Sequence, residues 1–540
     1  VVSKKSDGFG RDIEPLGGQG NLGEDDDIAG RAQFLWTPSD RAEFDLAVEY
    51  SDRSGTAVPQ ARIFFDKNTP AGRYLDDGGT NSVIGHNRNF KSSDLEKVTV
   101  DTPMLDELEV FGIALVANFE FDGMTLKSIT AYRDQEAENG QDFDGGRTPT
   151  INQTVTSEQE QFSQEFQLTG QTENGKMDWL LGAYYFEEEG TFITDVQVLF
   201  PTSTPAEPLK FGAVTPLDID TDNETESYAA FAQANYQITD KLSIAGGVRY
   251  TEETKSILIN TVVGGVTRVD NGRGEQTFDA VTPKLSIDYQ VHDDLLIYAS
   301  IAQGFRSGGY NGRAFIPNQL APFTEETSTS YELGFKSDLF ENRLRFNLAG
   351  FLNEYEDIQL TATATDALGG LIVTTANAGD MDLWGFEVEI EALPTENLTV
   401  FSSVGYVTSD QLKPKPGFRF QATTLPLASK WTVNVGTEYV LPMNALFGTK
   451  LGIDYAYQSG FFPQFDDSPL ARQEGYGLLN ARVQFTPQNE GNWTLTLWGK
   501  NIRDKVYRTA GQDAAMNNLP VVVGFFGPTR EYGATFAFSF

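Results

Sequence analysis

The sequence contains no cysteine and only two histidines, His86 and His292. The absence of cysteine excludes disulfides, thiolate metal sites and a cysteine nucleophile, and two distant histidines argue against a histidine-based metal site. Positive charge is scarce, because 40 Lys and Arg stand against 77 Asp and Glu, and the net charge of −37 argues against nucleic acid as a partner. No nucleophile is paired with a base, so we expect no enzymatic activity.

Long apolar runs are also missing. No stretch reaches the roughly 18 apolar residues of a membrane helix, and the longest candidates, 179–186 and 521–527, have the length of a strand. If the chain spans a membrane, strands must do so as a closed barrel. The first residue is Val and no signal peptide is recognisable, so we expect the chain to be processed or incomplete.

Alternation with a period of two is what the sequence does have. In the last ten residues Tyr532, Phe536, Phe538 and Phe540 share one side of a strand, and small residues occupy the other. The same alternation predicts that one set of side chains faces outward (Leu285, Ile287, Tyr289, Leu333, Phe335, Phe386 and Val388) and another inward (Lys284, Asp288, Glu332, Lys336 and Glu387). About twenty such segments occur, several of them long enough to cross a bilayer at a tilt.

Turns of two lengths alternate along the chain. Short ones lie at 37–41, 121–123, 239–240, 292–294, 340–342 and 394–397, and long polar ones at 6–26, 52–106, 136–156, 188–226, 256–275, 308–326, 409–424, 460–474 and 508–528. This alternation predicts an all-β, transmembrane, antiparallel up-and-down β-barrel with all long loops at one rim. Eight aromatic residues are placed as interfacial girdles: Trp36, Tyr50, Tyr132, Tyr250, Trp384, Trp431, Trp493 and Tyr532. A soluble propeller would show a repeat of its blades, and none is found.

Several segments resemble TonB-dependent outer-membrane receptors. They include 324–360 ("TEETSTSYELGFKSDLFENRLRFNLAGFLNEYEDIQL"), 298–313 ("YASIAQGFRSGGYNGR") and the last strand ("GPTREYGATFAFSF"), and the likeness covers essentially the whole chain. The resemblance implies a barrel of about 22 strands, of which about 20 are present. It assigns residues 1–540 to the barrel domain without the N-terminal plug. We therefore expect the chain to start within the third strand and to leave its first residues unpaired with 532–540.

The resemblance also implies a function. It implies a receptor in the outer membrane of a Gram-negative bacterium that takes up a scarce solute, such as an iron chelate or siderophore, cobalamin, or a carbohydrate or aromatic nutrient. Expected partners are membrane lipid and lipopolysaccharide, the small-molecule ligand, the barrel-assembly machinery, and the TonB–ExbB–ExbD complex through the absent N-terminal part. The alternative is a passive channel or a structural scaffold, and the upstream sequence would discriminate between the two.

Ligand recognition is expected on the long loops and the upper lumen. The candidate residues are Phe305, Arg306, Tyr310 and Arg313, because an aromatic–arginine pair suits an anionic or aromatic solute. The acidic balance of the chain favours a cationic solute instead, so the solute stays open. Lumen charges that would hold a plug, or simply hydrate a wide lumen, are Glu332, Lys336, Arg343, Arg345, Glu387, Glu389 and Glu391.

Two further motifs carry weaker signals. Residues 18–23 fit G-x-G-x-x-G but follow no buried strand, so a dinucleotide site is excluded. Asp218, Asp220 and Asp222 have the spacing of the first ligands of a calcium loop, but Asn223 replaces the required glycine. No cofactor is expected, apart from calcium in an outer loop.

Overall fold

The computed structural model describes residues 2–12, 20–65, 98, 100–143, 145, 151–198, 215–365, 371–410, 412–415, 425–442, 447–464, 467–487, 492–513 and 521–539. Strands make up nearly all of the regular structure, and one 3-10 turn, η1 (Pro317–Leu320), lies between two of them. Within these ranges no helix is long and apolar enough to cross a membrane.

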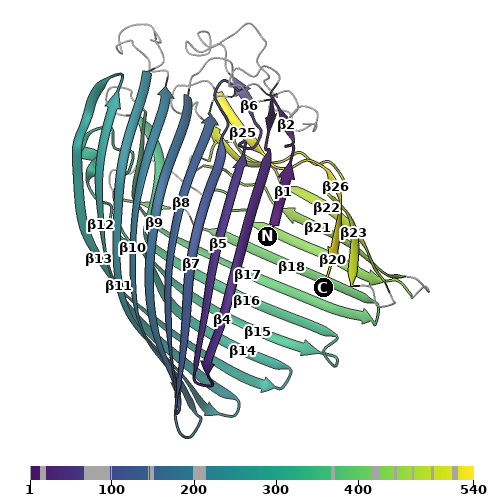
Figure 1. Ribbon diagram of the computed structural model, residues 1–540. Helices are drawn as coiled ribbons and strands as arrows, with labels where there is room; N and C mark the ends of the chain where they lie inside the picture. The colour runs from purple at the N-terminus through teal and green to yellow at the C-terminus, as the bar shows by residue number, and fades with distance from the viewer. Residues whose placement is uncertain are drawn as a thin grey trace.

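A single large antiparallel sheet forms the wall of the molecule (Figure 1). It contains β1 (Val2–Ser6), β4 (Asp25–Ser39), β5 (Ala42–Gly55), β7 (Asp106–Phe121), β8 (Met124–Asp142), β9 (Ile151–Gln171), β10 (Met177–Val198), β11 (Thr215–Thr239), β12 (Leu242–Val263), β13 (Val266–His292), β14 (Leu295–Arg306), β15 (Glu326–Leu339), β16 (Leu344–Thr365), β17 (Leu371–Thr395), β18 (Leu398–Ser409), β20 (Trp431–Val440), β21 (Phe447–Gln458), β22 (Tyr476–Pro487), β23 (Trp493–Lys500), β26 (Glu531–Phe538) and the short β19 (Lys413–Pro414). Each long strand pairs with the next one in the chain, as predicted for an up-and-down barrel.

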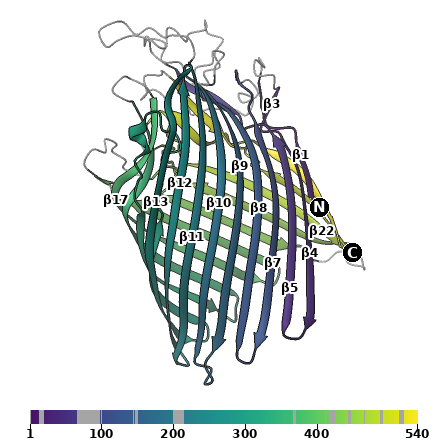
Figure 2. The ribbon, with the colours of Figure 1, turned by 60° about the vertical axis from the view of Figure 1, so that its left-hand side comes forward.

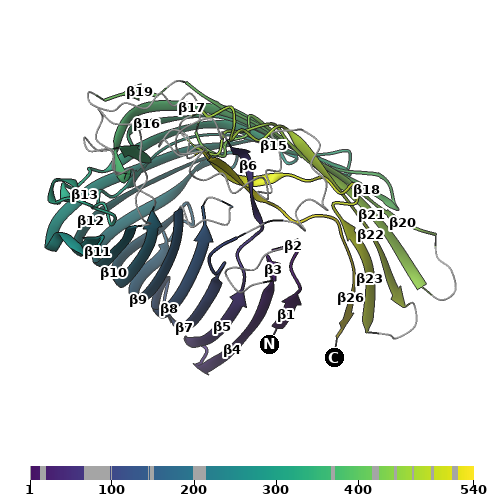
Figure 3. The same ribbon diagram turned by 90° about the horizontal axis from the view of Figure 1, so that it is seen from above.

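The two ends of this wall face each other without pairing. β1 pairs with β4 and β26 pairs with β23, and no register joins β1 to β26 in the part of the chain that the structure describes. Viewed from above, the N- and C-terminal ends lie on opposite sides of the interruption in the ring (Figure 3), and Figure 2 shows both ends near one edge of the wall. For the described residues, the expectation that the last strand does not pair with the first residues is confirmed.

The strands at the long-loop end are longer than the roughly ten residues that cross a bilayer, which corrects three loop predictions. β8 continues to Asp142 and β9 begins at Ile151, so most of the expected loop 136–156 is strand. β10 continues to Val198 and β11 begins at Thr215, so most of the expected loop 188–226 is strand. The expected loop 256–275 is a hairpin whose tight turn consists of Gly264 and Gly265, both with positive φ. Two consecutive positive φ values fit the type I′ turn that favours glycine. The tight turns 37–41, 121–123 and 340–342 join strands at the opposite rim.

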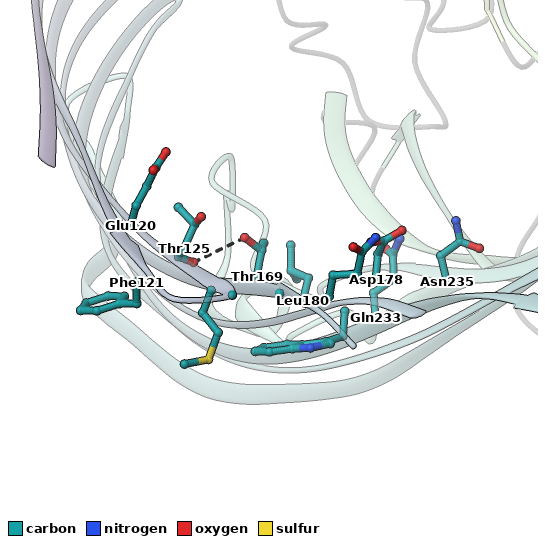
Figure 4. A pocket seen from close by; sticks show the side chains of 13 residues that line it. Glu120, Phe121, Thr125, Thr169, Asp178, Leu180, Gln233 and Asn235 are labelled. Atoms are coloured by element: carbon teal, nitrogen blue, oxygen red, sulfur yellow. Dashed lines mark hydrogen bonds between the residues drawn. The ribbon is translucent and has the colours of Figure 1, made fainter. Parts of the chain in front are cut away.

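The two faces of the wall follow from the register. In Figure 4, Glu120, Thr125, Asp178 and Asn235 point to the side where the rest of the barrel lies, and Phe121 points away. Residues that are paired across two strands lie on the same face of the sheet. Starting from Thr125 on the inner face, each partner on the next strand is therefore also on the inner face: Thr169, Leu180, Gln233, Gly247, Lys284, Ala302 and Ser330. The inner face therefore includes Glu332 and Lys336, and the outer face includes Leu285 and Leu333, as alternation predicted.

Aromatic residues mark the outer face near both rims. The same register places all eight predicted girdle residues outward, although Phe540 of the last strand lies outside the described residues. Tyr228 donates to Glu226 at 2.6 Å, Tyr185 to Glu187 at 2.9 Å and Tyr250 to Glu252 at 3.2 Å. Each of these carboxylates lies closer to the long-loop rim than its tyrosine does. The ring of tyrosines therefore separates an apolar band below it from an acidic wall above it.

Loops from both ends of the chain build a small domain of their own at the long-loop rim. β6 (Gln60–Phe65) pairs with β25 (Val521–Phe526), which pairs with β24 (Arg508–Asp513), and β2 (Gly10–Arg11) pairs with β3 (Asn21–Leu22) nearby. We call this assembly the loop domain. Its core contains Leu22, Ile63, Val98, Met104, Val522 and Phe526, all at most 1% exposed. Figure 1 shows β6 and β25 side by side at the upper end of the barrel.

Candidate functional site

The loop after β14 lies against the inner face of the extended strands β11–β13. Ile219, Ile259 and Val269 form an apolar cluster there, and Tyr310, Phe315 and Leu320 of the loop pack against it. Two hydroxyls fix the loop backbone, because Thr221 donates to the carbonyl of Gly312 at 3.1 Å and Thr261 to that of Ala314 at 2.7 Å. The loop is thus held inside the mouth of the barrel.

Gln359 of β16 holds the base of the same loop. Its side chain is buried, and its Nε2 donates to the carbonyls of Ser307 at 2.9 Å and Thr324 at 3.0 Å. Its backbone N–H donates to the carboxylate of Glu326 at 2.6 Å. Both ends of the loop are therefore hydrogen-bonded to one buried amide. The alternating pattern of the sequence did not indicate this role of Gln359.

The four predicted ligand residues do not converge on one site. Phe305 lies on the outer face and Arg306 on the inner face, because they are consecutive in β14. Tyr310 packs on Gly274, where an added Cβ would lie 2.4 Å from its ring. Arg313 follows in the loop, where its backbone N–H donates to Asn311 at 3.3 Å. Tyr310 thus packs against the barrel wall, and a ligand role for all four residues stays a prediction.

The predicted lumen charges do lie together on the inner face of β14–β17. Tyr298 donates to Glu332 at 2.6 Å, and the Lys336 ammonium lies 5.7 Å from the Tyr298 ring centroid. Arg345 bonds Asp338 at 2.9 Å and approaches Glu391 at 3.9 Å.

Two other predicted lumen residues, Glu387 and Glu389, share this inner face of β17, and Asn347 donates to Glu389 at 3.3 Å. The exception is Arg343, which lies in the tight turn before β16 and donates to the carbonyls of Leu393 and Pro394. It joins two turns at the rim instead of lining the lumen.

A second inner-face network spans β20–β22. Arg482 donates to Glu438 at 2.5 Å and to Asp454 at 3.5 Å, and Lys450 bonds Glu438 at 3.1 Å. Asn480 donates to the other oxygen of Asp454 at 2.7 Å. Each cation in this wall has a carboxylate partner. The inward parity of Arg482 was visible in the sequence, but its partners follow only from the strand register.

The loop domain contains a half-buried arginine, Arg508. Arg508 donates to the backbone carbonyl of Arg472 and to Oε1 of Gln473 at 3.3 Å. Burial lowers its pKa to about 10, although Glu474 acts in the opposite direction. Beside it, burial raises the pKa of Tyr507, whose ring stacks on Tyr476 with centroids 4.6 Å apart.

The three calcium candidates lie in a strand instead of a loop, and calcium binding stays a prediction. Asp218, Asp220 and Asp222 lie on one face of the extended strand β11, where successive same-face residues are roughly 7 Å apart. One of them, Asp222, accepts a hydrogen bond from Thr191 at 2.8 Å. In the described ranges no group of three His, Asp or Glu side chains could hold a metal ion. His292 ends β13 at a tight turn, and His86 lies outside those ranges.

The wall has some twenty antiparallel strands, an apolar outer face, a charged inner face and girdles of aromatic residues. These features define a transmembrane β-barrel of the outer-membrane class. Comparison with known proteins gives the family. Residues 20–502 match the family described as "TonB dependent receptor-like, beta-barrel". The chain belongs to this family.

The relatives are receptors. The pesticin receptor of Yersinia pestis is 30% identical over 292 residues, which cover 53% of this chain and 40% of that protein. The metal-pseudopaline receptor CntO of Pseudomonas aeruginosa is 26% identical over 35% of this chain and 25% of its own length. The matches thus span less than half of these curated relatives.

Solved structures share the fold over nearly the whole chain. The ferric yersiniabactin uptake receptor FyuA of Y. pestis matches with a TM-score of 0.77 and 18% identity over 99% of this chain and 73% of that one. The siderophore receptor PiuA of Acinetobacter baumannii matches with a TM-score of 0.68 and 14% identity over 95% and 74%. At these identities the likeness concerns the fold alone.

Proposed function

We propose that the protein is the barrel of an outer-membrane receptor that takes up an iron chelate and is energised through TonB. One observation carries the proposal above the others: a membrane-spanning wall has a lumen lined by charged and aromatic groups, with a loop held inside its mouth by Gln359. Family membership supports it, as do relatives whose names state siderophore or ferric-chelate receptors.

The proposal includes parts that the sequence does not contain. Each backbone group left unpaired in lipid costs several kcal/mol, and the edges of β1 and β26 have no register with each other in the described part. We propose that further strands close this interval and that a plug fills the lumen, which would provide the contact with the TonB–ExbB–ExbD complex. Insertion by the barrel-assembly machinery and contact with lipopolysaccharide belong to the same proposal.

Uptake by living cells tests the function. A deletion strain carrying the complete gene should accumulate a radiolabelled ferric chelate, and the accumulation should disappear when TonB is deleted. A panel of ferric siderophores, cobalamin and an aromatic nutrient identifies the solute. Passive entry that persists without TonB would favour the channel alternative, and no protein-dependent entry of any ferric chelate would overturn the proposal.

A further inference from the structure

The inner wall formed by β4–β12 carries arginines without an acidic partner. Arg31, Arg133 and Arg249 all lie on the inner face by register, and none of them makes an ion pair within the described part of the chain. The wall of β20–β22 differs, since Arg482 and Lys450 are neutralised there. The chain has a net charge of −37, so a group of cations without acidic partners is unusual in it. Such a group on one lumen wall would attract an anion.

Two of these arginines line a cavity of about 250 Å³ in the wall. Its lining includes the small residues Gly112, Ala114 and Ala131, which we call the floor. In the register Ala114 pairs with Ala131, and Gly112, on the same strand as Ala114, pairs with Arg133. Arg31 and Arg133 stand at its sides. The floor is flat because it has almost no side chains, so a planar group can lie against it.

Two acids, Glu49 and Glu188, lie in the same register row as these arginines, and neither forms an ion pair with them within the described residues. Glu188 accepts a hydrogen bond from Gln161 at 2.6 Å. Of these two acids, the lining itself contains only Glu49. Glu49 pairs in register with both Arg31 and Gly112. A Cβ at Gly112 would lie 3.0 Å from Cγ of Glu49, so the carboxylate chain leans over the glycine. Two guanidinium groups and one carboxylate give the cavity a net positive charge.

Aromatic rings continue the cavity toward β12. Phe186 lines it and stacks on Tyr184, with centroids 6.4 Å apart and planes 10° apart. The guanidinium of Arg249 lies 5.4 Å from the Tyr184 ring and 5.3 Å from the Phe231 ring. Guanidinium groups and rings therefore alternate along this wall, an arrangement suited to a flat anionic group.

We propose that this cavity binds an aromatic carboxylate. The ring would lie on the Gly112–Ala114–Ala131 floor beside Phe186, and the carboxylate would accept hydrogen bonds from Arg31 and Arg133, whose planar donors match it. The inference rests on the proposed uptake function and deepens it, because it assigns the chemical class of one part of the solute. An acidic side chain of a polypeptide filling the lumen offers the same carboxylate, so the experiment must separate the two sources.

Ligand-observed NMR on the complete receptor in detergent tests the proposal, with benzoate as the probe and benzamide as its neutral analogue. Benzoate should bind and benzamide should not. The double variant Arg31→Gln/Arg133→Gln should weaken benzoate binding by at least about tenfold, because each charge-assisted hydrogen bond is worth roughly that factor. Arg41→Gln is the matched control, because Arg41 lies in a tight turn of the same wall and pairs with Asp122.

The outcomes separate the hypotheses. Equal binding of benzoate to wild type and double variant would overturn the proposal. So would a wild type that binds no benzoate while the double variant melts at a lower temperature, because a polypeptide carboxylate would then occupy the cavity. Uptake of the ferric chelate is measured in parallel: absent uptake in wild type refutes the proposed function, whereas normal uptake without benzoate binding refutes only this assignment. Unchanged heat-dependent gel migration of each variant shows that the barrel has folded.

Discussion

Arg482 and Glu438 are 44 positions apart in the sequence, and on the inner wall the guanidinium of Arg482 donates to the carboxylate of Glu438 at 2.5 Å. Glu438 also bonds Lys450, and Arg482 also reaches Asp454, so the pair is the centre of a network. The side chains are 36% and 25% exposed to the lumen, which places them between a surface pair and a buried pair.

Replacing Arg482 by Gln should destabilise the barrel modestly. The substitution leaves Glu438 with Lys450 but leaves Asp454 with only the amide of Asn480. We expect a loss of about 1 kcal/mol, the upper end for exposed pairs, because water in the lumen screens the charges. Urea unfolding of the protein in lipid vesicles measures it. The double variant Arg482→Gln/Asp454→Asn should recover part of the loss, and equal stability of all three proteins would contradict the network.

Substitutions on β17 should report its two faces. Val388 faces outward and Glu387 inward, as alternation predicted and the register confirms. Arginine at Val388 should cost about 2–4 kcal/mol if the residue lies near the bilayer midplane, because the charge would be placed in lipid. Arginine at Glu387 should cost far less, since the lumen is polar. Folding into vesicles measured in urea compares the two, and a larger loss for Glu387→Arg would reverse the assignment of faces.

The faces of the strands could be predicted because alternation is a local property. Leu285 and Lys284 occupy opposite faces whatever strand lies beside them. The lengths of the strands could not be predicted in the same way. Residues 215–226 are rich in Asp and Glu and were interpreted as loop, yet pairing with β10 and β12 keeps them extended far above the girdle. When two polar segments pair with each other, neither segment shows the alternation of apolar and polar residues from which a strand is predicted.

The candidate site shows the same limit. The charges on β15–β17 were predicted to lie inward and do so, because only parity was needed. The four ligand candidates Phe305, Arg306, Tyr310 and Arg313 were chosen for their chemistry, and Phe305 and Arg306 point to opposite faces because they are consecutive in β14. The cavity between Arg31 and Arg133 was missed because its sides lie three strands apart.

Tyr507 should make the loop domain sensitive to alkaline pH. Burial raises its pKa above the ordinary value of 10.0. The neutral phenol is therefore favoured in the fold, and its contribution to stability is complete below pH 10 and declines as the pH rises through the raised value. Arg508 acts in the opposite sense, because its pKa of about 10 means that the unfolded chain retains its proton longer.

The Tyr507→Phe variant isolates the tyrosine. Its stability should fall less than that of wild type as the pH rises above 10, and the difference between the two tyrosinate absorbance titrations should show a group that titrates above 10. Tyr439→Phe, at a partly exposed tyrosine far from the loop domain, is the control. A difference titration centred below 10 would contradict burial of Tyr507.

The last prediction concerns the loop domain, which joins the first loops of the chain to the last ones through β6 and β25. Val522 is fully buried in its core beside Ile63. A carboxylate at that position would have no partner in an apolar interior, and an unpaired buried charge costs about 3 kcal/mol or more. This exceeds what a satellite core of a few side chains can absorb, whereas the barrel wall does not depend on Val522. We therefore expect Val522→Asp to open the loop domain and leave the barrel folded.

Protease treatment of intact cells should cleave the outer loops of this variant rapidly, and heat-dependent gel migration should be unchanged. Thr509→Asp introduces the same charge at an exposed position of β24 in the same sheet and should leave the loops resistant. If the two variants resist the protease equally, the packing of β6 against β25 does not hold the loops together.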